Sequence, residues 1–210
     1  MDAAPPLARD WSLLPLDVLS LVFARLSAVD VLMGAGLVCP SWLDAAKVPD
    51  VWPVVEMDDN EILEDKNLDK LRAMAKAAVD RSDGQLRVFA GKHFVTEEFI
   101  KHIVERSPSL TTLRLASCCS TLFSAQVADV IRASPLSELR SLELANVDLT
   151  VDELTAVLEN CPGLESLTVL YSDGMQEEEP NVQLCEFQTR RGLAKKSFAG
   201  EDGEGEYNNA

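Results

Sequence analysis

The stretch LTTLRLASC, from Leu110 to Cys118, decides which fold the middle of the chain adopts. Its pattern L-x-x-L-x-L-x-x-C returns as LRSLELANV from Leu139 and as LESLTV from Leu164, so that successive copies start 29 and 25 residues apart. Alternate side chains of a short strand point to opposite faces, so the leucines point inward together, and the last position turns the chain toward a helix. A repeat of this length predicts a solenoid in which parallel strands alternate with helices.

Two weaker copies of the pattern precede this stretch. They are Leu86-x-Val88-x-x-Gly91 and Trp52-x-x-Val55-x-Met57-x-x-Asn60. The spacing of 27 residues from Leu86 to Leu113 indicates that these two leucines occupy equivalent positions. The sequence therefore predicts that the solenoid begins near Trp52 and continues to about Tyr171.

Helix signals recur in step with the strands. Thr96, Ser124 and Thr150 are the expected N-caps, and Glu153 would complete a capping box with Thr150. A residue that precedes proline disfavours helical geometry. Three such pairs stand where the helices should stop: Ser107-Pro108, Ser134-Pro135 and Cys161-Pro162. The strand pattern, the N-cap, the helix and the helix stop thus recur with the same spacing and support the same repeat.

Residues 11–52 predict a compact module of three short helices. Apolar residues at helical spacing indicate a first helix that opens at Pro15. Asp30 is the expected N-cap of a second helix, and Pro40 is the expected first residue of a third. The module carries apolar residues on more than one face and is too small to bury them all, which predicts a partner that covers the excess.

The two ends of the chain lack this patterning. Residues 1–10 and 172–210 are predicted to be disordered, because the second range combines few apolar residues with acidic runs such as Glu177 to Glu179. The end of a solenoid exposes apolar surface unless something covers it. The array of repeats is therefore expected to be short and without a cap.

Composition limits the classes of partner. Nineteen basic and thirty-five acidic residues give a formal net charge of −16, so the chain repels a nucleic-acid backbone. The sequence contains no apolar run long enough to cross a membrane, and no membrane partner is expected. The five cysteines have no regular framework, which fits reduced thiols and predicts a location in the cytoplasm and/or nucleus.

Several positions of the N-terminal module match one known motif. They are Leu14-Pro15-Leu16-Asp17-Val18-Leu19, Leu26, Val38-Cys39 and Trp42, with Trp52 closing the module. This set closely resembles the F-box motif, and the repeats resemble the cysteine-containing leucine-rich repeats (LRRs) that often follow an F-box. The combination is similar to plant F-box/LRR proteins. The expected fold class is thus α/β, with a three-helix F-box at 11–52, a short leucine-rich-repeat solenoid at 53–171 and a disordered acidic tail at 172–210.

This resemblance implies a substrate receptor of a Skp–cullin–F-box ubiquitin ligase, which directs proteins to proteasomal degradation. The F-box would bind a Skp-type adaptor and, through it, cullin. Pro40 departs from the family, which more often has a basic or polar residue there. The adaptor-facing residues that the resemblance implies are Leu14, Pro15, Leu19, Val22, Phe23, Leu26, Val38, Cys39 and Trp42.

The repeats would present a concave face to a protein substrate. Alternation along the strands sends Arg87, Arg114, Glu143 and Thr168 away from the leucine core, so these four are candidates for substrate contacts. Their mixed charge identifies no particular ligand. The alternative function is a leucine-rich-repeat scaffold for protein interactions whose F-box is vestigial or serves a complex that is not a ligase.

The sequence contains no catalytic constellation, so no enzyme and no cofactor are expected. Cys39 has no histidine near it in sequence and is interpreted as a buried structural thiol. Cys118 and Cys119, taken with His93 and His102, lack the paired spacing of a zinc site, so no metal is expected either.

Overall fold

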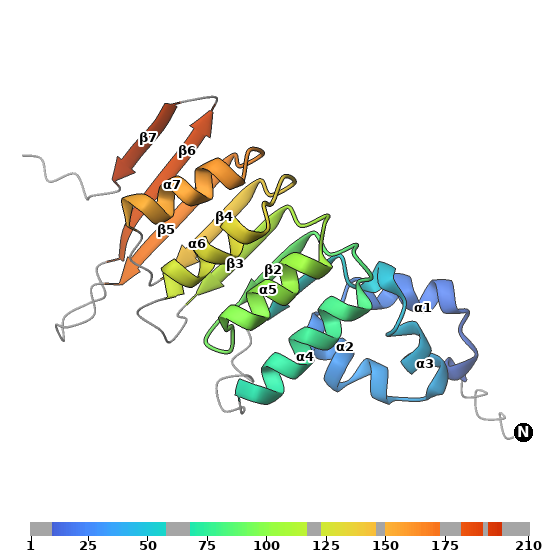
Figure 1. Cartoon of the computed structure of the whole chain (residues 1–210). Coiled ribbons are helices and arrows are strands. Elements are labelled where there is room, and N and C mark those ends of the chain that lie inside the picture. The colour runs from blue at the N-terminus through green and yellow to red at the C-terminus, as the bar shows by residue number, and fades with distance from the viewer. Residues whose placement is uncertain are drawn as a thin grey trace, which may run out of the picture.

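The computed structural model describes residues 10–57, 68–116, 123–145, 150–172, 182–190 and 193–198. The strands of this part form one sheet in the order β1-β2-β3-β4-β5-β6-β7, which is also their order in the chain (Figure 1). Their bounds are β1 Val54–Met57, β2 Val88–Gly91, β3 Thr112–Ala116, β4 Ser141–Ala145, β5 Ser166–Ser172, β6 Val182–Arg190 and β7 Leu193–Phe198.

Strands β1 to β5 pair in parallel, and one helix follows each of the first four. These helices are α4 (Leu68–Arg81), α5 (Glu97–Arg106), α6 (Phe123–Ala133) and α7 (Val151–Asn160). All four lie on one face of the sheet, and no described helix covers the other face, which we call the open face (Figure 1). The prediction of an α/β solenoid with parallel strands and helices is confirmed. Within the described ranges, no helix has the length and apolar character needed to span a membrane.

The register of the second repeat corrects the sequence alignment. Val88 pairs with Thr112 and Phe89 with Leu113, so Leu86 is level with Leu110 and not with Leu113. Phe89 takes the consensus leucine position and is fully buried. The spacing of 27 residues was therefore wrong as a guide to equivalent positions, because an aromatic residue replaces the leucine in this copy.

Gly91 occupies the place that Leu115 has in the next strand. A Cβ atom on Gly91 would lie 2.8 Å from Cγ2 of Val95 and 3.1 Å from Cζ of Phe94. Phe94, itself 2% exposed, thus fills the space that a consensus leucine would take. The apolar volume of the repeat is retained although its residues have moved along the chain.

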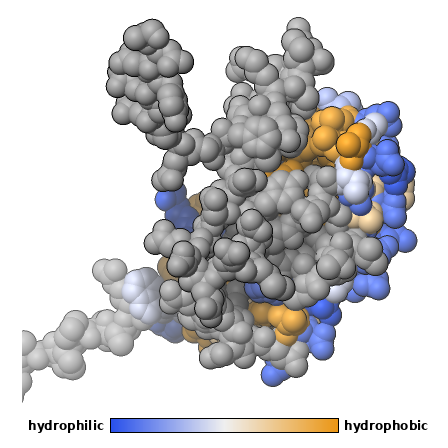
Figure 2. Space-filling view, turned by 90° about the vertical axis from the view of Figure 1, so that its left-hand side faces the viewer, coloured by the Kyte–Doolittle hydropathy of each residue, from blue (hydrophilic) through white to orange (hydrophobic). Residues whose placement is uncertain are grey.

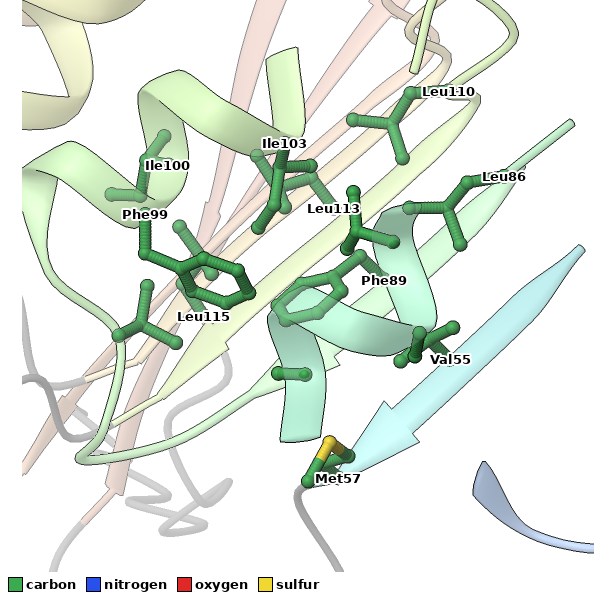
Figure 3. Packing of buried hydrophobic residues seen from close by; sticks show 14 of the residues in the cluster. Val55, Met57, Leu86, Phe89, Phe99, Ile100, Ile103, Leu110, Leu113 and Leu115 are labelled. Carbon is green, nitrogen blue, oxygen red and sulfur yellow. The ribbon is translucent and has the colours of Figure 1, made fainter. Parts of the chain in front are cut away.

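The core lies between the sheet and the four helices and extends continuously into the N-terminal module. Figure 3 shows its central part, where Phe89 of β2 and Phe99 of α5 lie close together among leucine and isoleucine side chains. The centroids of these two rings are 5.6 Å apart, with planes at 76°, an edge-to-face contact that aromatic rings favour. One apolar layer therefore holds neighbouring repeats together.

The N-terminal module contains α1 (Leu16–Phe23), α2 (Ala28–Met33) and α3 (Pro40–Ala45), with 3-10 turns at Trp11–Leu13, Ala35–Leu37 and Pro49–Val51. Pro15 precedes α1 and Pro40 is the first residue of α3, as the sequence predicts. The predicted cap of α2 is wrong by three residues. Ser27 is the N-cap and accepts a 3.1 Å hydrogen bond from the backbone N–H of Asp30, while the Asp30 carboxylate accepts from the Ser27 hydroxyl.

Some of the helix boundaries predicted in the repeats are confirmed, and others are not. Thr150 and Glu153 form the predicted capping box, and the three proline pairs follow the ends of α5, α6 and α7. Thr96 is the N-cap of α5 but accepts no side-chain cap bond. Ser124 lies inside α6, which already begins at Phe123.

Trp52 joins the N-terminal module to the repeats. Its side chain is 1% exposed, and its indole Nε1 donates a 3.0 Å hydrogen bond to the backbone oxygen of Ala46, which follows α3. The Arg81 guanidinium at the end of α4 lies 5.6 Å from the Trp52 ring centroid and also donates to the Ala46 oxygen at 3.3 Å. Burial lowers the pKa of this guanidinium. The N-terminal module and the end of α4 thus meet at one buried contact around Trp52.

The C-terminal segment differs from the predicted disordered tail in two ranges, which form β6 and β7. Strand β6 pairs antiparallel with β5 from Ser166 opposite Gln188 to Ser172 opposite Val182, and β7 pairs with β6. Without β6, strand β5 would present a row of unpaired backbone groups. The acidic average of this segment obscured the short apolar run VQLCEF at 182–187. Residues 1–9, 173–181, 191–192 and 199–210, also predicted to be disordered, lie outside the described residues.

Replacing Phe89 with alanine should lower the free energy of unfolding by about 3–5 kcal/mol, because it removes a fully buried ring from a packed core. Val151→Ala is the control, since Val151 is 78% exposed and its truncation should change stability by less than about 0.5 kcal/mol. Urea unfolding followed by circular dichroism measures both. Equal midpoints for the two variants would contradict this account of the core.

Candidate partner-binding surface

Exposed large apolar side chains concentrate on the N-terminal module. Among the residues whose side chains the structure describes, only Val54, Leu68 and Val151 have this character elsewhere. We call the set on the module the apolar surface. Its members are Trp11, Leu13, Leu16, Val18, Leu21, Val22, Leu26, Met33, Leu37 and Val38. Figure 2 shows that hydrophobic residues also reach the surface in two places on the side turned to the viewer there, between hydrophilic ones.

The apolar surface follows from the sequence of α1. This helix has eight residues, LDVLSLVF, of which six are apolar, and a helix on the surface of a core can turn only one side inward. Leu19 and Phe23 point into the core with 1% exposure each, whereas Leu21 is 70% exposed and Val22 48%. Exposed apolar area of this extent marks a site that a partner covers.

The nine predicted adaptor-facing residues divide into three groups. Pro15, Val22, Leu26 and Val38 are exposed, so a partner can reach them. Leu14, Cys39 and Trp42 are half-buried. Leu19 and Phe23 lie in the core of the chain itself, and a direct contact with a partner does not fit that position.

Leu19 and Phe23 instead position the residues around them. The ring of Phe23 meets Trp42 edge-on, with centroids 5.5 Å apart. Trp42 in turn donates from Nε1 to the backbone oxygen of Trp11 at 3.1 Å, and Ser41 donates to the oxygen of Ser12 at 2.9 Å. These bonds tie the turn before α1 to α3, so that both segments present their exposed side chains from one rigid support.

The motif match did not single out several members of the apolar surface as adaptor contacts. Leu16, Val18, Leu21 and Leu37 are examples, with exposures from 40% to 71%. The signal for the residues on α1 was present in the sequence, because apolar residues on every side of a short helix cannot all be buried. A search for one buried stripe at helical spacing overlooks this signal.

Two cysteines among the described residues have opposite environments. Cys39 is half-exposed, contrary to the interpretation as a buried thiol, and its Sγ lies 3.2 Å from the Ser41 hydroxyl oxygen. Hydrogen bonds from the Ser41 side chain and from the backbone N–H of Trp42 lower the pKa of Cys39. Burial raises the pKa of Cys161 to about 11.

The second candidate surface is the open face of the sheet. Arg114, Glu143 and Thr168 occupy one row across β3, β4 and β5, and each is partly exposed. Arg87 lies just before β2, near the edge where the strands begin, and so outside this row. The structure thus brings three of the four candidate substrate contacts together. In the described part of the chain, no group of three acidic, histidine or cysteine residues is placed to hold a metal ion.

Two family profiles match the chain. Residues 11–53 match the F-box domain, and residues 85–193 match the family described as "FBD-associated F-box protein At5g56370, LRR repeats". The first range contains the whole apolar surface. The second contains strands β2 to β6 and reaches the start of β7.

Individual relatives from Arabidopsis thaliana have an F-box in their names, and the second one also has leucine-rich repeats. The chain is 32% identical to F-box protein SKIP19 over 88% of this chain and 61% of that protein. It is 30% identical to "Putative F-box/LRR-repeat protein 23" over 76% of this chain and 34% of that protein. It therefore spans between about a third and three fifths of the length of these relatives.

The two thiols should differ in reactivity in a chain that carries Cys118→Ser, Cys119→Ser and Cys185→Ser. Because only the thiolate reacts, Cys39 should be alkylated by iodoacetamide at pH 7.5 at least about ten times faster than Cys161. Raising the pH should bring the Cys39 rate to a plateau at a lower pH than for an unperturbed thiol, because its pKa is lowered, while Cys161 stays slow until the chain unfolds. Mass spectrometry of peptides gives both rates, and equal rates in the folded chain would contradict the assigned environments.

Proposed function

The chain belongs to the family of F-box proteins with leucine-rich repeats, and we propose that it is a substrate-receptor subunit of a Skp–cullin–F-box ubiquitin ligase. Members of this family are adaptors and not enzymes. In the proposed complex the chain performs no chemistry of its own. It binds a Skp-type adaptor through the F-box, reaches cullin through that adaptor and holds a protein substrate on the repeats.

The observation that carries the proposal is the apolar surface of the F-box. Leu21, Leu37 and Val38 are each at least 63% exposed, although burial would remove about 25 cal/mol of unfavourable free energy per Å² of apolar area. A partner that covers these side chains gains this free energy on binding. The revised adaptor-binding set keeps Leu14, Pro15, Val22, Leu26, Val38, Cys39 and Trp42 and adds Leu16, Leu21 and Leu37 from the apolar surface.

The buried junction at Trp52 supports the second half of the proposal. A ubiquitin ligase must hold its substrate at a defined distance from the catalytic subunits, and this requires a rigid receptor. The Trp52 indole, the Ala46 carbonyl and the Arg81 guanidinium connect the F-box to the first repeat, and a 3-10 turn, Pro49–Val51, lies between Ala46 and β1. We place the complex in the cytoplasm and/or nucleus, where reduced thiols fit the unpaired Cys39 and Cys161.

Binding to a purified Skp-type adaptor tests the first step. Val22→Glu and Val38→Glu should each weaken adaptor binding by at least about tenfold, because a charge would be buried without a counter-charge in an apolar interface. Val151→Glu places the same charge on an exposed valine of α7 and should leave the affinity unchanged. Isothermal titration calorimetry measures the affinity, and circular dichroism checks that each variant is folded.

Equal adaptor affinities for all three variants and the unchanged chain would remove the basis of the proposed interface. Co-purification with tagged cullin tests the second step. Recovery of adaptor and cullin together supports the ligase. Recovery of adaptor without cullin would instead support the alternative, a leucine-rich-repeat scaffold whose F-box serves a complex that is not a ligase.

A further inference from the structure

One row of side chains crosses the middle of the open face. It contains Glu56, Ala90, Arg114, Glu143 and Thr168, one from each of the strands β1 to β5. Neighbouring strands are about 4.8 Å apart, so adjacent members of the row can contact each other. The distribution of charge along this row is uneven.

Arg114 pairs with the more distant of its two acidic neighbours. Its Nη2 donates to Oε1 of Glu56, two strands away, across the small side chain of Ala90, which is fully buried. Glu143, on the adjacent strand, has no hydrogen-bond or ion-pair partner among the described residues. The Arg114 Nε is buried and also lacks an acceptor within the described part. The row therefore keeps one uncompensated carboxylate beside one unused donor.

The surroundings of Glu143 leave room for a ligand. On its own strand the neighbours on the same face are Ser141 and Ala145, on β3 they are Thr112 and Ala116, and on β5 they are Ser166 and Leu170. Apart from Leu170, these side chains are small or polar and too short to cover the Glu143 carboxylate. A side chain from a partner can reach it from the open side of the sheet.

Other cations near the open face of strands β1 to β5 do not neutralise Glu143. Arg140 lies at the edge where the strands begin and pairs with Glu165 at 2.5 Å. Arg87 lies near the same edge, three positions before the member of the row on its strand. The charges within the row are thus two carboxylates and one guanidinium, and the excess negative charge lies at Glu143.

We propose that the open face binds a basic protein segment whose lysine or arginine side chain pairs with Glu143. This inference rests on the proposed function, since it names the class of substrate segment that the receptor takes. The Thr168 hydroxyl can bond to the backbone of the segment beside that pair. The net charge of −16 attracts a basic segment at long range and adds to its rate of association.

Selection from a random-peptide display library on the full chain tests the inference without the adaptor. Peptides retained by the unchanged chain should be enriched in lysine and arginine. The enrichment should be lost with Glu143→Gln and kept with Glu159→Gln, which removes the same charge from the exposed surface of α7. A synthetic copy of the most enriched peptide should bind Glu143→Gln about fivefold to tenfold more weakly than the unchanged chain, and high salt should reduce that difference.

Absence of basic enrichment on the unchanged chain, or enrichment that survives Glu143→Gln, overturns the inference. The result is separate from the test of the ligase function, because Glu143 is far along the chain from the F-box. Glu143→Gln should bind the Skp-type adaptor as the unchanged chain does. Normal adaptor binding together with unaltered peptide selection would therefore reject the basic-segment site alone.

Discussion

Burial of the inward-facing strand side chains under helices α4 to α7 is the constraint on which the remainder of the structure depends. A single strand–helix unit of about 25 residues cannot enclose its own apolar face, so each repeat is stable only when a neighbour stacks against it. Leu113, Leu142 and Leu167 form such a stack, one per strand and each fully buried. The same alternation that buries these leucines sends Arg114, Glu143 and Thr168 to the open face.

In the F-box, only some of the apolar side chains are buried in this way. Leu19 and Phe23 are buried in a core that continues into the repeats, whereas the other side of α1 has nothing to pack against within the described chain. Trp52 joins the F-box rigidly to the repeats, because it closes the F-box and occupies the first consensus position of the repeats. A receptor that must hold two partners at a fixed separation gains from such a shared residue.

At the far end of the sheet, backbone pairing with β6 covers the edge of β5, the last parallel strand. Strands β6 and β7 reverse direction and continue the hydrogen-bond ladder beyond β5. Antiparallel neighbours need only a short connection, whereas a parallel strand requires a crossover of a dozen or more residues. The sheet therefore continues past the last helix of the repeats.

The sequence by itself determined the repeat, the capping box of Thr150, the helix stops at the proline pairs and the presence of an F-box, because these depend on local spacing and on residues that act on their own backbone. Only the tertiary structure decided that Phe89 replaces a leucine, that Leu19 and Phe23 belong to the core, and that Arg114 pairs with Glu56 and leaves Glu143 open. Each of these depends on which side chain fills a shared space or reaches a distant partner. Such choices are made between segments 20 to 60 residues apart, and the period of the repeat does not say which side chain fills the space between them.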